Sequence, residues 1–201
     1  MNGPRPLPLF GGVGFHVREL QADEVPRMQA FFEANPEYWL TVNGVPPPPG
    51  LAQIEFDERP PPPLTYVHNR YAGLFDEAGV LNGLVVYVEG FTAPDVAHLA
   101  LFIVATSLRG SGLAQRVYDA LEDHLRSRGA RWLRLGVVAG NSDGERFWER
   151  QGCVELRRRT GVDTGGRINT VRVMLKPLVA GATVEGYLAF AARDRPEPPQ
   201  G

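Results

Sequence analysis

A short glycine-containing segment, Arg109-Gly-Ser-Gly-Leu-Ala114, has the residue types of an anion-binding turn. A helix that begins directly after such a turn leaves backbone N–H groups without partners and carries about half a positive charge at its start. Because Gly110 and Gly112 have no side chains, a phosphate can approach these groups closely. A tight turn that only joins a strand to a helix is the simpler alternative, since neither a G-x-G-x-x-G pattern nor a Gly-Lys-Ser/Thr ending is present.

Apolar residues on both sides of this turn indicate the elements that position it. Residues 98–104 form a nearly unbroken apolar run, which is typical of a strand buried on both faces. After the turn, apolar residues recur every four positions and therefore share one stripe of a helix. These residues are Leu113, Val117, Leu121 and Leu125. Gly129 supplies a stop signal for this helix.

The remaining hydrophobic patterns predict a mixed α+β fold. Strands are predicted at residues 14–20, 66–76, 80–89, 131–138, 153–159 and 170–175, and helical segments at 21–35, 37–42 and 142–151. Ser142 and Glu145 have the spacing of a capping box at the start of the last helix. The step from the central strand to residues 131–138 passes through the long helix, so these two strands are predicted to be parallel. The other strands make a mostly antiparallel sheet flanked by helices.

Proline and glycine dominate the segments that carry no such pattern. Proline runs at residues 46–49 and 60–63 bracket residues 50–59, which are predicted to form a surface loop or, alternatively, a stiff rim beside an acceptor pocket. Residues 160–168 are predicted to be a glycine-rich loop. We expect a flexible N-terminus at residues 1–12, one domain at 13–178, and a C-terminal extension at 179–201 that becomes a loose tail from Arg193 onward.

Two motifs resemble the signatures of the GNAT superfamily of N-acetyltransferases. The first, Arg109-x-x-Gly112-x-Ala114, is similar to the family's acyl-CoA signature, Gln/Arg-x-x-Gly-x-Gly/Ala. The second runs from Asn141 to Cys153 and is similar to Asn-x-x-Ala-x-x-Phe-Tyr-x-x-x-Gly-Phe. The resemblance covers residues 98–153. It implies the GNAT acyltransferase fold, in which a parallel pair of strands splays apart at the site of coenzyme A (CoA).

The resemblance also implies which residues contact acetyl-CoA. In the family, main-chain amides of the turn hold the CoA pyrophosphate, and the preceding strand pairs with the pantetheine arm. The matching residues are Arg109, Gly110, Ser111, Gly112, Leu113 and Ala114 for the pyrophosphate, and Phe102, Ile103 and Val104 for the arm. Asn141 matches an Asn that hydrogen-bonds the arm, although it could serve only as a helix cap.

Trp148 is a departure from the family pattern. This position often holds a Tyr that protonates the departing CoA thiolate, whereas indole has no titratable proton near neutral pH. With Phe147, Trp148 is expected to line the thioester channel. Water or the acceptor's own proton would then replace the usual acid.

Two residues are candidates for the base that deprotonates an acceptor amine. In histone-type members of the family a Glu lies eleven positions before the turn signature, and His98 stands there in this sequence. Histidine titrates near neutral pH, but a buried and inert histidine is the alternative. Glu89, at the end of the preceding predicted strand, is the second candidate, and a solvated strand end is its simpler interpretation. Glu37 and Tyr38 lie where family members wall the acceptor site, and packing is their alternative role.

Composition excludes several other classes of protein. The 201 residues carry a net charge of −2, which argues against a broad nucleic-acid-binding surface. No apolar run approaches the roughly 20 residues of a membrane span, and the first residues lack the features of a signal peptide. Cys153 is the single cysteine, so no internal disulfide can form and a cytoplasmic location is expected. No metal site is expected.

The predicted function is acetyl transfer from acetyl-CoA to a primary amine of a small molecule or peptide by direct attack. A backbone N–H of Ile103 or Val104 would polarise the thioester carbonyl. Cys153 is expected to be an apolar filler and not a nucleophile. The alternative is an acyl-CoA-binding regulatory module without catalysis, which Trp148 would permit. A homodimer is left open by the resemblance.

Overall fold

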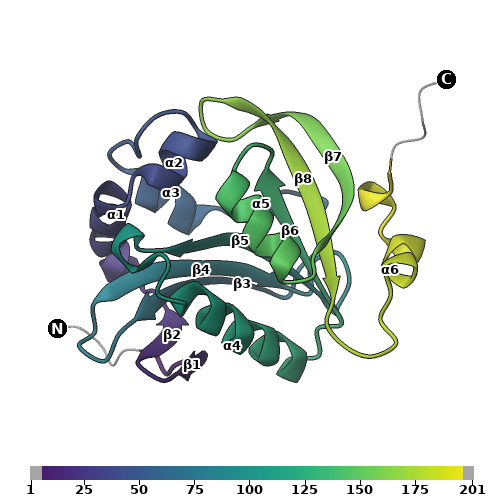
Figure 1. Ribbon diagram of the computed structural model, residues 1–201, viewed down its shortest axis with the longest axis horizontal. Helices are drawn as coiled ribbons and strands as arrows, with labels where there is room; N and C mark the ends of the chain where they lie inside the picture. The colour runs from purple at the N-terminus through teal and green to yellow at the C-terminus, as the bar shows by residue number, and fades with distance from the viewer. Residues whose placement is uncertain (1–5, 197–201) are drawn as a thin grey trace.

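The computed structural model describes residues 6–196, whose centre is one eight-stranded sheet (Figure 1). The strands are β1 (Phe10–Gly12), β2 (Phe15–Glu19), β3 (His68–Phe75), β4 (Leu81–Glu89), β5 (Val96–Val104), β6 (Trp132–Val138), β7 (Val154–Asp163) and β8 (Ile168–Pro177). Their order across the sheet is β1-β2-β3-β4-β5-β6-β8-β7. Only β5 and β6 are parallel neighbours among the described strands, which confirms the predicted mixed sheet.

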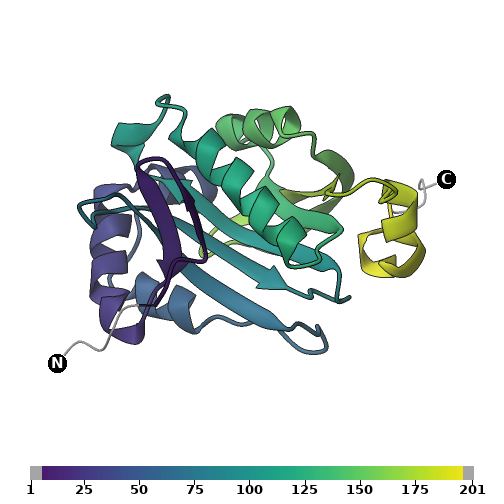
Figure 2. The ribbon, with the colours of Figure 1, turned by 90° about the horizontal axis from the view of Figure 1, so that it is seen from below.

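Helices cover both faces of this sheet. They are α1 (Val25–Ala34), α2 (Glu37–Val42), α3 (Leu51–Asp57), α4 (Leu113–Ser127), α5 (Ser142–Arg150) and α6 (Val184–Phe190). Seen from below, α4 and α5 lie on one face, and α1 and α3 lie on the other (Figure 2). The apolar stripe that predicted α4 faces the sheet, and Leu121 and Leu125 are completely buried. Each such leucine contributes about 1.5–3 kcal/mol of burial free energy.

A β-bulge in the centre of the sheet sets which residues of β5 face which layer. Tyr87 of β4 lies opposite Leu99, but the preceding Val86 lies opposite Leu101, so Ala100 has no partner residue in β4. The extra residue reverses the alternation of side chains. Leu99 packs in the core under α4, whereas Leu101 packs in the core shared with α1 and α3.

The N-terminal segment is more ordered than the sequence predicts. Residues 10–12, which were expected to be flexible, form β1 and pair with β2 in an antiparallel hairpin. Phe10 packs against His124 of α4, with 5.2 Å between ring centres. This contact with the long helix explains why a Gly-rich segment becomes a strand. Residues 1–5, also predicted to be flexible, lie outside the described residues.

The segment between the proline runs is a helix, so the predicted surface loop was wrong. Gly50 adopts a left-handed conformation (φ 82°) and precedes α3. The Gln29 side chain of α1 accepts a hydrogen bond from the Ala52 N–H (3.0 Å) and donates one to the Pro48 carbonyl (3.1 Å). Ala52 is fully buried against α1. The helix therefore depends on tertiary contacts that its short, proline-bounded sequence does not reveal.

The β7–β8 hairpin is longer than predicted and reaches across the molecule to α2 (Figure 1). Residues 160–163 continue β7, so the predicted loop at 160–168 shrinks to residues 164–167. The Val42 carbonyl at the end of α2 accepts hydrogen bonds from Asn169 Nδ2 (2.7 Å) and Thr164 Oγ1 (3.3 Å). These two contacts join segments that are about 120 residues apart.

The C-terminal extension is docked on the sheet, at least as far as residue 196. Asp194 was expected in a loose tail, but it is completely buried and forms two hydrogen bonds to the Arg134 guanidinium of β6 (2.7 and 2.9 Å). The Tyr187 hydroxyl of α6 donates a third hydrogen bond to Asp194 (2.5 Å). Residues 197–201 of the predicted tail lie outside the described residues. The domain boundary at residue 178 stays a prediction.

Candidate functional site

The glycine turn, residues 109–114, has the geometry of an open anion-binding loop. Gly110 and Gly112 both have left-handed backbone conformations, with φ of 76° and 77°. A side chain at Gly110 would meet no other atom within 4 Å, so the space beside this residue is open. Left-handed φ values are costly for most other residues, which explains both glycines in physical terms.

Several amides of the turn have no acceptor in the described part of the chain. Ser111 N bonds the Leu108 carbonyl and Leu113 N bonds Ser111 Oγ, whereas the N–H groups of Gly110, Gly112 and Ala114 remain unpaired. They lie at the start of α4, where the helix dipole also favours an anion. These groups fit the pyrophosphate contacts that the sequence predicts. The Leu113 side chain is buried in the core, so only its main chain could take part.

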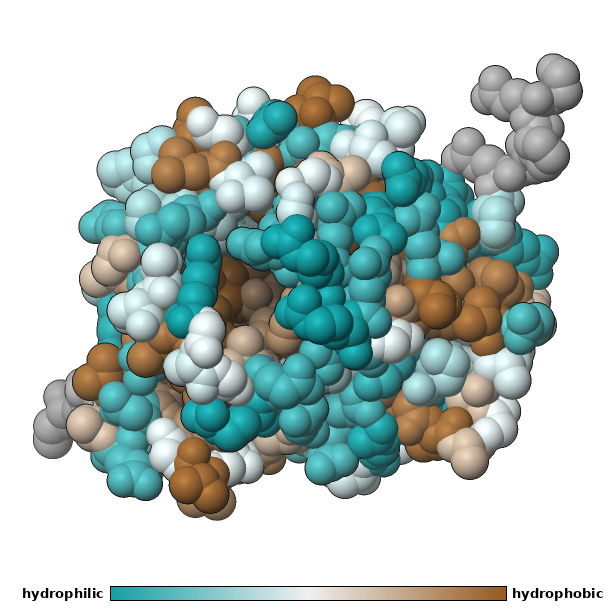
Figure 3. All heavy atoms as spheres, in the orientation of Figure 1, coloured by the Kyte–Doolittle hydropathy of each residue, from teal (hydrophilic) through white to brown (hydrophobic). Residues whose placement is uncertain are grey.

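The gap needed for a pantetheine arm begins at Leu99. Strands β5 and β6 are paired from Val96 with Trp132 to Leu99 with Leu135, and no pair follows. Beyond that point β6 continues its pairing with β8 only. Ala100 and Gly136, one on each side of the parting, are both exposed. Figure 3 shows a hollow with apolar atoms at its bottom, beside α5 and over the course of β5. The predicted splayed pair is therefore confirmed.

Aromatic side chains form the wall of this gap on the α4 face. Phe102 and Phe147 are partly buried and their rings are stacked, with 5.8 Å between centres. Val104 lies on the same face, whereas the Ile103 side chain is buried on the opposite face and offers only its main chain. Trp148 is 8% exposed and packs edge-on against Phe102. Its indole is thus a core side chain at the base of the wall.

Asn141 is the N-cap of α5, so the predicted Ser142–Glu145 capping box was wrong. Asn141 Oδ1 accepts a hydrogen bond from Gly144 N (3.2 Å) and is the only side-chain cap that the helix start uses. The side chain is partly buried, and its Nδ2 group has no acceptor among the described residues, so it could also donate to a ligand. The helix is anchored by Arg172 of β8, which bonds Glu145 (3.1 Å) and Glu149 (3.0 Å).

His98 lies on the face away from α4, where the C-terminal segment covers the sheet. Its Nδ1 is 3.1 Å from the Arg134 carbonyl and 3.3 Å from the Arg134 guanidinium, and its ring packs on Phe91. Burial first, and then the charge of Arg134, lower the pKa of His98 to about 3. Such a weak base is poorly matched to an amine. The role of His98 as the base stays a prediction, and these surroundings argue against it.

Glu89 lies at the end of β4 among cations and away from the parting of the strands. Its carboxylate is 3.7 Å from Arg70, 3.6 Å from Arg128 and 4.0 Å from His124 Nε2. It is opposite Ala97, in the paired half of β5. The described contacts are those of a structural ion-pair cluster, and a catalytic role for Glu89 stays a prediction.

Other predicted features can be placed as well. Cys153 is buried, and burial raises the pKa of its thiol to about 12, as expected for an apolar filler. Glu37 accepts a hydrogen bond from the Thr106 hydroxyl (2.6 Å), which ties α2 to the end of β5.

Within residues 6–196, no group of three or more His, Cys, Asp or Glu side chains could hold a metal ion. None of the described helices is both long and apolar enough to cross a membrane.

Sequence reasoning missed the two small residues at the parting. Ala100 occupies the bulge, and Gly136 interrupts an otherwise large-residue strand. A glycine inside a strand is a signal for close approach of another chain or ligand, so Gly136 could have been found. The bulge at Ala100 has no signal in the sequence, because it depends on the register with β4.

A parallel strand pair that opens beside unpaired amides at a helix start is the arrangement that the resemblance to the GNAT family predicts. The model of the acetyltransferase (GNAT) family matches residues 28–153, which is more than half of the chain. The chain therefore belongs to the GNAT family of acetyltransferases. No curated protein matches the sequence significantly.

Solved structures share this fold at low sequence identity. An acetyltransferase from Thermus thermophilus is 20% identical, with a TM-score of 0.61 over 82% of this chain and 97% of the other. Spermidine N-acetyltransferase from Vibrio cholerae, in complex with CoA and spermine, is 17% identical, with a TM-score of 0.63 over 83% and 97%. A Salmonella typhimurium acetyltransferase that modifies the N-terminal serine of ribosomal protein L7/L12 is 14% identical, with a TM-score of 0.64 over 85% and 97%.

Proposed function

We propose that this protein transfers an acetyl group from acetyl-CoA to a primary amine by direct attack of the amine on the thioester. The observation that carries the proposal is the parting of β5 and β6 after Leu99, in line with the unpaired amides of the glycine turn. The family match supports acetyl transfer, and the fold is shared with enzymes that are named for amine substrates.

The residues of this chain would act mainly by holding acetyl-CoA. The amides of Gly110, Gly112 and Ala114 would bind the pyrophosphate, and the free edge of β5 at residues 102–104 would pair with the pantetheine arm. That pairing would place the thioester beside Ala100, where a backbone N–H of the same edge can polarise the carbonyl. Cys153 is buried in the core, so its burial supports direct attack over an acyl-enzyme.

The acceptor would approach from the side of α2, α3 and the β7–β8 hairpin. The Thr164 and Asn169 side chains of the hairpin donate hydrogen bonds to the Val42 carbonyl, so the hairpin and the end of α2 are joined on this side of the molecule. We propose a small amine or the end of a peptide as the acceptor. The single buried cysteine is compatible with the cytoplasm, where we place the protein. A homodimer stays a prediction.

A steady-state assay of thiol release from acetyl-CoA, run over a panel of primary amines, tests this function. We expect at least one amine to give CoA and N-acetyl product in equal amounts, well above the rate of thioester hydrolysis. Background hydrolysis alone with every amine in the panel would refute catalysis by direct attack.

A second candidate is a module that binds acetyl-CoA and does not catalyse. It is favoured by one observation, the buried Trp148 at the position where an acid is usual. Tight binding of acetyl-CoA in calorimetry, together with no turnover of any amine, would support this candidate over the enzyme.

A further inference from the structure

Arginines gather on one face of the β7–β8 hairpin. Residues that are partners in neighbouring strands share a face of the sheet. Arg157 is the partner of Val173 in β8, and Val173 packs in the core with Tyr187 of α6, so this is the face away from α4. Arg159, two residues along, is the partner of Val171 and lies on the same face. The proposed acceptor side is on this face as well, because α3 lies on it (Figure 2).

The opposite face of the hairpin, which points toward α5, compensates its arginines fully. Arg158 Nε bonds Glu155 (2.9 Å), and Arg172 bonds Glu155 (2.5 Å) as well as two carboxylates of α5. Arg159, by contrast, is exposed, and among the described residues it forms no hydrogen bond and no ion pair. The hairpin therefore supplies counter-charges on one face and leaves the charge of Arg159 uncompensated on the other.

Arg193 of the C-terminal segment adds a second charge that is only partly compensated. Its Nε lies 4.0 Å from Asp194, but that carboxylate is already bound by Arg134 (2.7 and 2.9 Å) and by the Tyr187 hydroxyl. The guanidinium groups of Arg134 and Arg193 both lie over the Phe91 ring, each 5.4 Å from its centre. Two guanidinium groups therefore share one carboxylate.

Arg157 shows that these charges belong to one part of the surface. It lies on the same face of β7 as Arg159, and its guanidinium donates a hydrogen bond to the Arg193 carbonyl (3.0 Å). The C-terminal segment thus lies against the stretch of β7 that carries both arginines. We call Arg157, Arg159 and Arg193 the arginine patch.

The row of residues between Arg159 and the parting of the strands is open. Val171, the partner of Arg159, is also the partner of Val138 in β6. A Cβ at position 136 would lie 3.0 Å from Val171 Cγ1, so Val171 lies beside the exposed Gly136 at the parting. Val138 and Val171 are only half-buried. Neighbouring strands are about 4.8 Å apart, so the backbone of Arg159 lies roughly 10 Å from the parting.

Two carboxylates on the proposed acceptor side are held by other groups. Asp163, farther along β7, accepts hydrogen bonds from the amides of Gly165 (2.9 Å) and Gly166 (3.1 Å). Glu37 of α2 accepts one from the Thr106 hydroxyl (2.6 Å). Neither carboxylate forms an ion pair with the arginine patch, so the patch keeps its positive charge.

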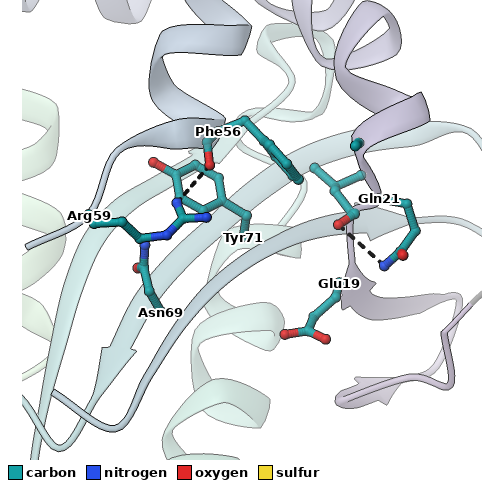
Figure 4. A pocket seen from close by; sticks show the side chains of 8 residues that line it. Glu19, Gln21, Phe56, Arg59, Asn69 and Tyr71 are labelled. Carbon is teal, nitrogen blue, oxygen red and sulfur yellow. Dashed lines mark hydrogen bonds between the residues drawn. The ribbon is translucent and has the colours of Figure 1, made fainter.

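Arg59, on the other side of the sheet, is a poorer place for an acidic ligand. It lines a cavity of about 260 Å³ together with Phe56 and Tyr71 (Figure 4). Its guanidinium donates to the carbonyls of Phe56 (2.8 Å) and Glu58 (2.7 Å), and the carboxylate of Glu19 lines the same cavity. Because this cavity contains both signs of charge, it does not select for an anion as the arginine patch does.

We propose that Arg159, supported by the charge of Arg193, binds a carboxylate of the acceptor, an inference that rests on the proposed function. The acceptor is then a peptide whose N-terminal amine reaches the parting and whose second, third or fourth residue is Asp or Glu. An extended peptide advances about 3.3 Å per residue, so about three residues span the distance to Arg159. A guanidinium presents its N–H donors in a planar fork that fits a carboxylate. A peptide suits this span better than a free amino acid, whose amine and carboxylate are separated by a single carbon.

The test compares Arg159→Gln with Arg158→Gln, the same change at the next residue of β7, on the opposite face. Two peptides serve as acceptors, identical except that Asp and Glu at positions two to four of one are Asn and Gln in the other. We expect the wild type to prefer the acidic peptide about tenfold or more in kcat/KM, since hydrogen bonds between charged groups change affinity by about that factor. Arg159→Gln should lose this preference through a higher KM, with kcat, melting temperature and acetyl-CoA affinity unchanged. Arg158→Gln should keep it.

A charge reversal and a binding measurement complete the test. Arg159→Glu should prefer a third peptide, with Lys at positions two to four, over the acidic one, and added salt should weaken the preference of the wild type. Equal kcat/KM of the wild type for the acidic and the neutral peptide would overturn this proposal alone, as would an unchanged preference in Arg159→Gln. Acetylation of free glutamate as fast as the acidic peptide would also overturn it.

Binding without turnover separates this inference from the proposed function. The acidic peptide, labelled at its C-terminus, is titrated with protein in the presence of CoA, and fluorescence anisotropy reports the affinity. We expect Arg159→Gln to bind it about tenfold more weakly than Arg158→Gln. A wild type that acetylates no amine would refute the proposed function, whereas equal binding by the two variants would refute the carboxylate site.

Discussion

The two halves of β5 differ in what lies along their edge toward β6. From Val96 to Leu99 the strand is paired with β6, and the C-terminal segment covers the face of the sheet that points away from α4. From Ala100 to Val104 the same edge is free and ends beside the unpaired amides of the glycine turn. One strand therefore serves as core in its first half and as a candidate binding surface in its second.

This difference shows which interactions fix the geometry of each half of β5. The paired half depends on side chains from distant parts of the chain, above all Arg134 and Asp194. The free half depends on main-chain geometry: a bulge at Ala100 and two left-handed glycines. Changes in the first half should therefore alter stability and spare CoA binding, and changes around the second should do the reverse.

The largest effect is expected from Asp194→Ala. It leaves the Arg134 guanidinium buried without its partner, and breaking a buried pair in this way costs about 3–5 kcal/mol of the free energy of unfolding. Urea unfolding measures the loss. Affinity for acetyl-CoA, measured by calorimetry on the folded variant, should not change. A loss of stability below about 1 kcal/mol would show that the C-terminal segment is not an integral part of the core.

The same pair predicts a pH dependence. Burial alone would raise the pKa of Asp194, but the hydrogen bonds and charge of Arg134 outweigh burial and hold that pKa below its usual value. The pair therefore stabilises the fold fully above the unfolded pKa of about 3.9 and less as the pH falls further. The difference in unfolding free energy between the wild type and Asp194→Asn should be constant near neutral pH and shrink below about pH 4.

A comparison of Gly110→Asp with Gly110→Asn tests the glycine turn beside the free half of β5. Both side chains tolerate a left-handed backbone, and the space beside Gly110 is open, so the two variants differ mainly in charge. The carboxylate would face the bound diphosphate, and we expect acetyl-CoA to bind about tenfold more weakly to Gly110→Asp than to Gly110→Asn. Equal affinities in calorimetry would place the diphosphate somewhere else.

A smaller effect is expected from Asn141→Ala. The change removes the N-cap of α5 and should cost about 1 kcal/mol of stability, whereas Asn141→Asp keeps an acceptor for Gly144 N and should be close to the wild type. Thermal unfolding of the two variants measures how much the cap contributes to stability. If Asn141 also donates to the pantetheine arm, both variants should bind acetyl-CoA more weakly, and unchanged affinity in both would limit Asn141 to its structural role.

The smallest effect concerns the bridge between the hairpin and α2. Asn169→Ala removes two hydrogen bonds of the Asn169 Nδ2 group, one to the Val42 carbonyl and one within the hairpin to Thr164 Oγ1, and each is worth about 0.5–1.5 kcal/mol. We expect a severalfold rise in KM for the acceptor amine and no change in the affinity for acetyl-CoA, because the bridge lies on the acceptor side. A change in acetyl-CoA affinity without a change in KM for the amine would reverse that assignment.

The side that we propose for CoA could be predicted from the sequence because it is built from contiguous residues. The apolar run, the glycine turn and the stripe of α4 each follow a local rule, and the structure places them as expected. Asn141 was found for the same reason, and its alternative role as a helix cap is confirmed, although a capping box had been assigned to Ser142 and Glu145. The positions of such residues follow from their own short-range patterns.

The proposed acceptor side and the C-terminal segment could not be predicted, because their order comes from distant contacts. α3 forms between two proline runs because Gln29 of α1 hydrogen-bonds the chain at its start and because it packs in the core that it shares with α1. The β7 extension is exposed along most of its length and has no alternation of hydrophobic residues that would predict a strand. Asp194 lies in a charged, proline-rich stretch whose composition gives no sign of a buried partner in β6. The first two segments border the proposed acceptor side, whereas Asp194 belongs to the paired half of β5.

A crystal structure with acetyl-CoA bound tests the central claim most directly. Our account predicts the diphosphate within hydrogen-bond distance of the amides of Gly110, Gly112 and Ala114, with the pantetheine arm along the free edge of β5 and the thioester beside Ala100. A diphosphate elsewhere, for example in the cavity lined by Phe56 and Tyr71, or strands β5 and β6 paired beyond Leu99, would contradict it.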